Sequence, residues 1–256
     1  MTPQRAFLKK EVWEFLRTWR IWVLTVPILI FAIGGPIFTY FSPVIFETTF
    51  DAYSDGSIDV FVPKPTWIDS YMQWATNLKR VVPVIVLVIA GSAITGEVVS
   101  GSAIPVLTGG LGRKDFVLIK FAIISTMAVA AIVVGTMINW IVGKLLFPDM
   151  RFVGVIAIIG VASLLVLVLV ALAILASTFM PDAMSTIGLE MFIFLILSVA
   201  TLWSPARQFS PAGLLSSLTD LARNGEANFI APALSTIIFT IVLLTMAVTI
   251  FQRREL

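Results

Sequence analysis

Six long apolar segments dominate the pattern of hydrophobic and polar positions along the chain. Within them the apolar residues do not alternate with polar ones as in a half-buried strand, and a strand in lipid would also require a closed barrel. A bilayer core about 30 Å thick is crossed by about 20 helical residues. The sequence therefore predicts six transmembrane helices, at about 21–41, 80–97, 118–142, 152–178, 184–203 and 230–251.

A charged amphipathic segment precedes the first span. Between residues 5 and 20, apolar side chains recur at helical spacing, opposite charged ones. The apolar set is Phe7, Leu8, Val12, Phe15, Leu16 and Trp19, and the charged set is Arg5, Lys9, Lys10, Glu14 and Arg17. We expect residues 1–20 to form a helix in the membrane interface and residues 21–256 to form one six-span domain. No signal-peptide cleavage pattern follows, so the first span is expected to stay in the chain.

The composition excludes an ordinary soluble domain and most enzyme classes. Hydrophobic residues make up 59% of the chain and charged residues 12%, against about 25% charged in globular proteins. The absence of cysteine and histidine removes disulfides, thiolate and imidazole metal sites and the usual general base. We expect no catalytic residue, metal or cofactor in this chain, and a net charge of +2 gives no reason to expect nucleic acid.

The distribution of charge predicts the orientation in the membrane. An even number of spans puts both termini on one side. If that side is the cytoplasm, ten of the 17 Lys and Arg residues fall in cytoplasmic segments, as the positive-inside rule favours. The first external loop then carries the acidic residues Glu47, Asp51, Asp55, Asp59 and Asp69. We therefore expect a multi-pass protein of the cell (inner or plasma) membrane with both termini cytoplasmic.

The segments between spans carry further signals. In the predicted external loop 42–79, a short helix from Thr66 onward is expected, and its spacing of i, i+4 and i+7 predicts membrane-interface anchors at Trp67, Tyr71 and Trp74. Residues 204–229 are too polar to cross and are broken by Pro and Gly, which predicts an external hairpin. Asp182, after a tight turn, is expected to cap the fifth span.

The loop after the second span has unusual chemistry for a connector. Residues 96–120 read GEVVSGSAIPVLTGGLGRKDFVLIK, with five glycines, a proline and a basic end. We interpret it as a docking element in which Glu97, Arg113, Lys114 and Asp115 offer charges to a soluble partner; the alternative is an interfacial helix with snorkelling cations. Its glycine-rich part lacks the Ser or Thr that follows the lysine of a P-loop, so the chain has no ATP site of this type.

This loop resembles that of the permease subunits of ABC type-2 transporters. The resemblance rests on Gly96-Glu97, Gly101, Pro105, Arg113 and Lys120, although Ser102 and Ala103 stand where a Thr and an acidic residue are frequent. Further support comes from Trp67…Tyr71…Gln73…Asn77-Leu78 before the second span and from Phe251-Gln252-Arg253-Arg254 at the end. The resemblance covers essentially the whole chain by topology.

The resemblance implies an all-α integral membrane protein with six transmembrane helices. It also implies an N-terminal amphipathic interfacial helix, a cytoplasmic coupling helix after span two and an external helical hairpin before span six. The implied partners are soluble ABC ATPase subunits that hold ATP and Mg, a second permease subunit in a homo- or heterodimer, and membrane lipid. The implied ATPase-coupling loop comprises Gly96, Glu97, Gly101, Pro105, Arg113, Lys114 and Lys120.

Two polar residues inside the predicted spans are candidates for a translocation path. Glu190 lies within the fifth span, where a carboxylate costs about 2.5–3.5 kcal/mol, and either contacts cargo or a proton, or snorkels and bonds a neighbouring helix. Asn139, in the third span, either lines the path or joins helices.

The leading hypothesis is a permease subunit of an ATP-driven exporter that moves a hydrophobic or amphipathic cargo and is not itself an enzyme. The absence of a deep charged cavity signature in the sequence favours that type of cargo. One alternative is a non-transporting membrane scaffold or immunity protein. Another is an ion-coupled carrier in which Glu190 takes the proton.

Overall fold

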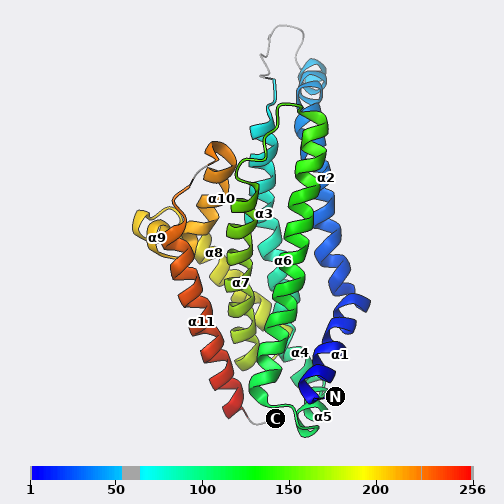
Figure 1. Cartoon of the computed structure of the whole chain (residues 1–256), viewed down its shortest axis with the longest axis vertical. Helices are drawn as coiled ribbons and strands as arrows, with labels where there is room; N and C mark the ends of the chain where they lie inside the picture. Colours follow the sequence, from blue (N-terminus) through cyan, green and yellow to red (C-terminus); the bar gives the residue numbers. More distant parts are fainter. Residues whose placement is uncertain (1, 54–63, 226, 255–256) are drawn as a thin grey trace.

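The computed structural model describes residues 2–53, 64–225 and 227–254. In these residues the chain is all-helical, without strands. Six helices are long and apolar enough to cross a membrane, and they stand side by side as an elongated bundle (Figure 1). They are α2 (Trp19–Tyr53), α3 (Trp67–Gly91), α6 (Arg113–Leu146), α7 (Val155–Phe179), α8 (Ala183–Ala200) and α11 (Ile230–Arg253). The predicted all-α class, with six helices long and apolar enough to span a membrane, is therefore confirmed.

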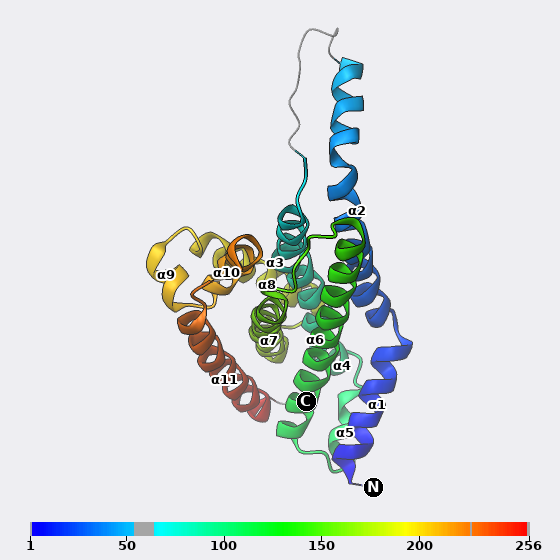
Figure 2. The ribbon, with the colours of Figure 1, turned by 45° about the horizontal axis from the view of Figure 1, so that its top comes forward.

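Five shorter helices lie at the two ends of the bundle. They are α1 (Pro3–Arg17), α4 (Thr95–Val99), α5 (Ala103–Thr108), α9 (Ser204–Phe209) and α10 (Ala212–Asn224). Helices α1, α4 and α5 lie at the end that also holds both chain termini, which we call the terminal end (Figures 1 and 2). Helices α9 and α10 follow α8 in the chain and lie at the opposite end of α8 and α11 (Figure 1).

The predicted loop 42–79 is wrong in extent. Helix α2 continues to Tyr53, and α3 begins at Trp67, so most of this segment is helical. The start of α3 is fixed by a capping box, in which the side chain of Asp69 accepts from the Thr66 amide at 2.7 Å. The third span is also longer than predicted, since α6 covers Arg113–Leu146. Asp55 and Asp59 of the predicted acidic loop lie outside the described residues.

Asp182 caps α8 as predicted. Its carboxylate accepts hydrogen bonds from the Ser185 amide at 2.9 Å and from the Ser185 hydroxyl at 2.7 Å. These bonds, the amide bond first, hold the pKa of Asp182 below its usual value. The carboxylate is therefore charged at neutral pH, and this caps the first turn of the helix with a negative charge.

Helix α7 forms the centre of the bundle. It packs against α11, α6, α3, α10 and α8. In its apolar 18-residue stretch 56% of the residues are buried, against 11% for the matching stretch of α8 and 17% for that of α11. The outer helices thus expose large apolar side chains such as Leu195, Phe239 and Ile241. Water would penalise this surface strongly, whereas lipid or a second apolar subunit would cover it.

Glycine allows close contact between α6 and its neighbours. A Cβ added at Gly135 would lie 2.5 Å from Ile28 Cγ2 and 3.1 Å from the Trp74 ring. The Trp74 indole N–H donates to the Thr136 hydroxyl at 3.1 Å, which fixes the ring at this position. The absence of a side chain at Gly135 therefore sets the distance between α6, α2 and α3.

We predict that Gly135→Ala lowers stability by about 1–3 kcal/mol, because the new methyl group overpacks a contact between three helices. Gly160→Ala is the matched control, since nothing lies within 4 Å of its added Cβ. The measurement is the unfolding of both variants in mixed detergent micelles. Equal stability of the two variants would contradict the packing role of Gly135.

Candidate functional site

The segment between α3 and α6 forms two short helices at the terminal end. Helices α4 and α5 are joined by a turn in which Gly101 has a positive φ of 73°, a conformation that favours glycine. Gly110, with φ of 93°, makes the next turn before α6. Two glycines of the predicted loop are therefore needed for the backbone path itself.

A partly buried ion cluster holds this segment to the rest of the chain. The cluster comprises Lys10, Glu11, Glu14, Glu97 and Lys120. The Lys120 ammonium lies 3.1 Å from Glu11 Oε2 and 3.0 Å from Glu97 Oε1, and only 1% of its side chain is exposed. The Lys10 ammonium lies 2.9 Å from Glu11, from Glu14 and from Glu97. These contacts connect α1, α4 and α6.

The charges of the cluster pair with one another, although Glu97 Oε2 is buried without a hydrogen-bond partner in the described residues. A buried charge is tolerated only when it is paired and hydrogen-bonded. Burial opposes the charge of Lys10, but hydrogen bonds to Glu11, Glu14 and Glu97 outweigh that effect and raise the pKa of Lys10. Glu11, Glu14 and Glu97 also offer oxygens within 4.8 Å of one another, as a metal site would. Because the two ammonium groups already occupy that space, a divalent cation would have to displace them.

Aromatic packing also holds α1 against α6 and connects α6 to α11. The Phe7 ring stacks on Phe116 with centroids 5.3 Å apart, and Phe116 stacks on Phe251 at 5.4 Å. Phe7 and Phe15 of the predicted interfacial helix are buried, so α1 packs partly on protein rather than resting on the membrane by its whole apolar face. Leu8 and Leu16 of the same helix remain exposed.

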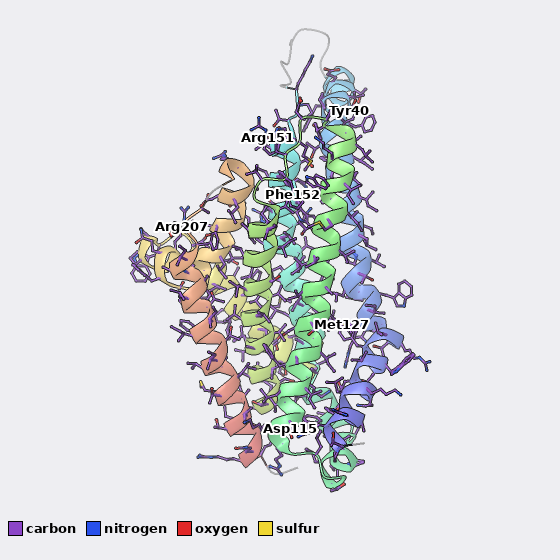
Figure 3. All side chains as sticks on the ribbon, in the orientation of Figure 1. Tyr40, Asp115, Met127, Arg151, Phe152 and Arg207 are labelled. Carbon is purple, nitrogen blue, oxygen red and sulfur yellow. The ribbon has the colours of Figure 1, made fainter. Side chains whose placement is uncertain are left out.

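Three of the predicted docking charges make contacts within the chain. Glu97 is in the ion cluster. The Arg113 guanidinium donates to the backbone oxygens of Phe251, Gln252 and Arg254 at the end of α11. Asp115, labelled at the terminal end in Figure 3, accepts from Gln4 at 2.9 Å.

Lys114 is the predicted docking charge that stays exposed, and it makes no ion pair within the described residues. In α4, α5 and the residues beside them, Gly96, Pro105 and Thr108 are also exposed, as are Val99 and Ile104. A cavity of about 310 Å³ opens on this side of α5, lined by Ile104, Leu107, Thr108, Leu111 and Arg113. We call the exposed set Val99, Ile104, Pro105, Thr108 and Lys114 the α4–α5 face.

Glu190 is fully buried in α8, and neither carboxylate oxygen has a hydrogen-bond partner within the described residues. It lies against Gly91 of α3, where an added Cβ would come within 2.9 Å of both oxygens. Four residues before Glu190, the Thr186 hydroxyl lies 3.3 Å from the Thr95 hydroxyl. Thr95 also contacts Ser177, whose hydroxyl accepts from the Ile94 and Thr95 amides. The expectation that Glu190 snorkels or bonds a neighbouring helix is therefore wrong, since the carboxylate is sealed between helices without a partner.

Asn139 does not join Glu190 in one site. Its amide donates to the Ala32 carbonyl at 3.2 Å, connecting α6 to α2, and it lies beside Gly35 and Gln73. Gln73 precedes Gly91, the neighbour of Glu190, by 18 residues of α3, or about 27 Å of helix. The two candidate path residues are therefore near different ends of the bundle.

The predicted interface anchors are corrected for Tyr71 and Trp74, which are each 1% exposed. The Tyr71 hydroxyl donates to the Arg151 carbonyl at 2.9 Å, and Trp74 bonds Thr136. Both side chains face α6 and the loop after it, because α3 is covered by protein on that side. Trp67 is half-buried and packs edge-on against Tyr71.

Sequence reasoning missed the role of Glu11. It belongs to neither the apolar nor the charged set of the predicted helix, yet it is 5% exposed and pairs with Lys120. Its position at i+4 from Phe7, on the apolar side, was the available signal.

We predict that Lys120→Met lowers stability by about 3–5 kcal/mol, because it leaves Glu11 and Glu97 buried beside each other with one cation fewer. Lys114→Met is the control, since it removes an exposed lysine from the same helix. Unfolding in mixed micelles measures both. A Lys120→Met variant as stable as wild type would show that the cluster gives no net stabilisation.

Comparison with known proteins bears on the chain as a whole. A search of curated proteins finds no match. A family model, described as "Protein of unknown function (DUF2705)", matches residues 29–256, which include Glu97, Lys120 and Glu190 but not α1. Since the match covers far more than half of the sequence, the chain belongs to the DUF2705 family.

Proposed function

We propose that this chain is the membrane-spanning permease subunit of an ATP-driven ABC exporter, with the terminal end in the cytoplasm. The observation that carries the proposal is the α4–α5 element. It extends from the second membrane-crossing helix, is braced to two other helices by buried ion pairs, and leaves one face uncovered. A connector without a binding role would not need this bracing.

The bracing matters because α4 and α5 are too short to be stable alone. Isolated helices below about 12–15 residues are marginal in water, and these have 5 and 6 residues. The ion cluster fixes α4 to α1 and α6, so a push on α5 reaches several helices together. Arg113 extends this connection to the end of α11.

The proposed partner for the α4–α5 face is a soluble ATPase subunit that holds ATP and Mg. The face offers apolar Val99 and Ile104, 66% and 49% exposed, the cation Lys114, which has no ion pair within the described residues, and the cavity beside α5, which Ile104 lines. Closure of two ATPases would shift the bundle between two arrangements. Cargo would move only if its affinity differs between those arrangements.

The exposed apolar surface supports a dimer and a hydrophobic or amphipathic cargo. Helices α8 and α11 bury few of their apolar residues within one chain. A second permease subunit or lipid would cover them, and a cargo of the same character would enter this environment at low cost.

We predict that wild type co-purifies in detergent with the ABC ATPase encoded nearest to its gene, and that Ile104→Glu combined with Lys114→Glu lowers recovery of the ATPase about tenfold or more. The two substitutions change the net charge of the α4–α5 face by −3, one unit at Ile104 and two at Lys114. We propose that this face is buried on binding, where added charge is costly. Recovery is measured by quantitative immunoblotting of the purified complex.

Lys9→Glu is the control, since it reverses an exposed lysine at the same end on α1. Its ATPase recovery should equal that of wild type, and thermal unfolding should show that all variants remain folded. If wild type purifies without an ATPase and has no ATP-dependent behaviour, the permease proposal is wrong.

The burial of Glu190 favours a second candidate, an ion-coupled carrier. A carboxylate that is fully buried without hydrogen-bond partners in the described residues is more easily kept protonated than ionised. Binding and release of that proton would then be the coupling step. This function would need no ATPase.

If the carrier function holds, wild type alone in vesicles moves protons down an imposed pH gradient, and Glu190→Gln abolishes that movement because glutamine cannot exchange a proton. A pH-sensitive dye inside the vesicles measures the rate. Asp182→Asn, which removes an exposed carboxylate from the start of the same helix, is the control. Absence of proton movement in wild type rules out the carrier.

A further inference from the structure

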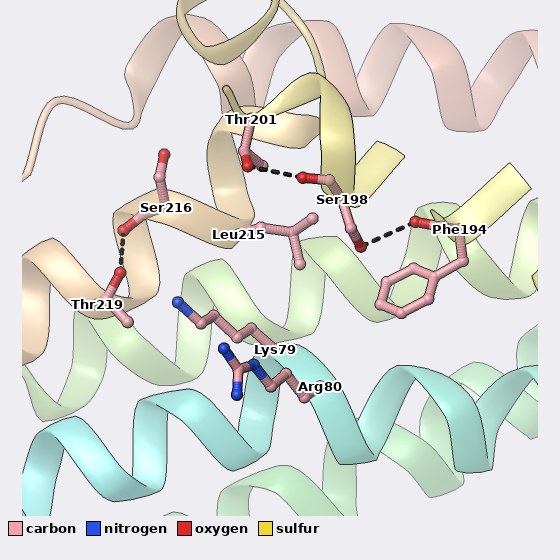
Figure 4. Close-up of a pocket in the computed structure, with 8 residues that line it drawn as sticks. All are labelled: Lys79, Arg80, Phe194, Ser198, Thr201, Leu215, Ser216 and Thr219. Carbon is pink, nitrogen blue, oxygen red and sulfur yellow. Dashed lines mark hydrogen bonds between the residues drawn. The ribbon is translucent and has the colours of Figure 1, made fainter. Parts of the chain in front are cut away.

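A cavity of about 320 Å³ lies between α3, α8 and α10, away from the α4–α5 face. Lys79 and Arg80 of α3 line one side, and Phe194 of α8 and Leu215 of α10 contribute apolar surface. Figure 4 shows both basic side chains extending from α3 on the side that faces α8 and α10. The remaining lining side chains carry hydroxyl groups.

The positive charge of this cavity is not neutralised by the described residues. Neither Lys79 nor Arg80 forms a hydrogen bond or an ion pair with any of them. Asp220 is close enough to Lys79 to act on its charge, but the Asp220 carboxylate pairs with Arg207 at 2.9 Å. Lysine offers three N–H donors and arginine five, so the cavity has many donors without acceptors.

The hydroxyl groups of the cavity already donate hydrogen bonds within the chain, so they do not supply donors to an anion. Ser198 donates to the Phe194 carbonyl at 2.9 Å, and Thr219 donates to the Ser216 carbonyl at 2.8 Å. These donors are used within their own helices, as the dashed lines in Figure 4 show. Recognition of a negative charge therefore falls to Lys79 and Arg80.

The surroundings favour an anion that carries an apolar chain. Lys79 and Arg80 mark the point on α3 where a polar half changes to the apolar run 81–91. Because Lys and Arg are costly in hydrocarbon, this point belongs at the headgroup level. On α8, next to the lining residues Phe194 and Ser198, Leu195 and Val199 are 59% and 57% exposed.

We propose that this cavity binds the phosphate headgroup of an anionic membrane lipid, with Lys79 and Arg80 contacting the phosphate and the acyl chains lying along the exposed side of α8. The site requires no ATPase and is separate from the α4–α5 face. Failure of lipid binding and failure of ATPase capture are therefore distinguishable.

The test is binding of acyl-chain-labelled phosphatidylglycerol and phosphatidylcholine to the purified full chain in dodecyl maltoside, followed by fluorescence anisotropy. We expect wild type to bind phosphatidylglycerol about tenfold more tightly, because the choline cation of phosphatidylcholine offsets the charge of its phosphate and is repelled by Lys79 and Arg80. Lys79→Gln combined with Arg80→Gln should remove the preference. Arg80→Gln alone changes an exposed side chain and should reduce the preference for phosphatidylglycerol. This single variant replaces the double variant in the test if the double variant does not fold.

Arg151→Gln combined with Arg223→Gln is the matched control, because it removes two exposed cations outside the cavity lining. Arg151 is labelled in Figure 3, and Arg223 belongs to α10, which also lines the cavity. This control should keep the preference. A preference absent from wild type, or lost equally in the control, would overturn the proposal. Displacement of the lipid by inorganic phosphate as readily as by unlabelled phosphatidylglycerol would also overturn it, since the site would then bind a free anion.

Discussion

The buried ammonium of Lys120 is the constraint on which the terminal end depends. A lysine that is 1% exposed must be paired, and its partners Glu11 and Glu97 come from segments more than 80 residues apart in sequence. Their convergence fixes α1 and α4 against α6 at the same time. The short helices α4 and α5 therefore have a defined position, although neither is long enough to be stable by its own backbone bonds.

The second feature of the molecule is its excess of apolar surface. Helix α7 is enclosed by protein, while α8 and α11 face outward with apolar side chains. In water a protein with this surface would aggregate, whereas lipid removes the free-energy cost of exposing the outward apolar side chains. Small residues and polar hydrogen bonds then determine which helices contact one another. Gly135 and the bond between Trp74 and Thr136 are examples.

Polar groups within the bundle are separated rather than aligned. Glu190 lies against Gly91, Asn139 lies near the other end of α3, and Lys79 with Arg80 faces a third place between α8 and α10. These polar groups thus do not come together in one site within the described residues.

The sequence by itself determined the six helices and the all-α class, because lipid forces an apolar segment of sufficient length to satisfy its backbone bonds as a helix. It also located the loop around Glu97, the cap at Asp182 and the unusual acid Glu190. Only the tertiary structure decided which charges are free, since Arg113 pairs with carbonyls 138 or more residues away and Glu97 pairs with α1. For the same reason Tyr71 and Trp74 turned out buried: a helical spacing of aromatic residues defines a face, but not whether lipid or another helix covers it.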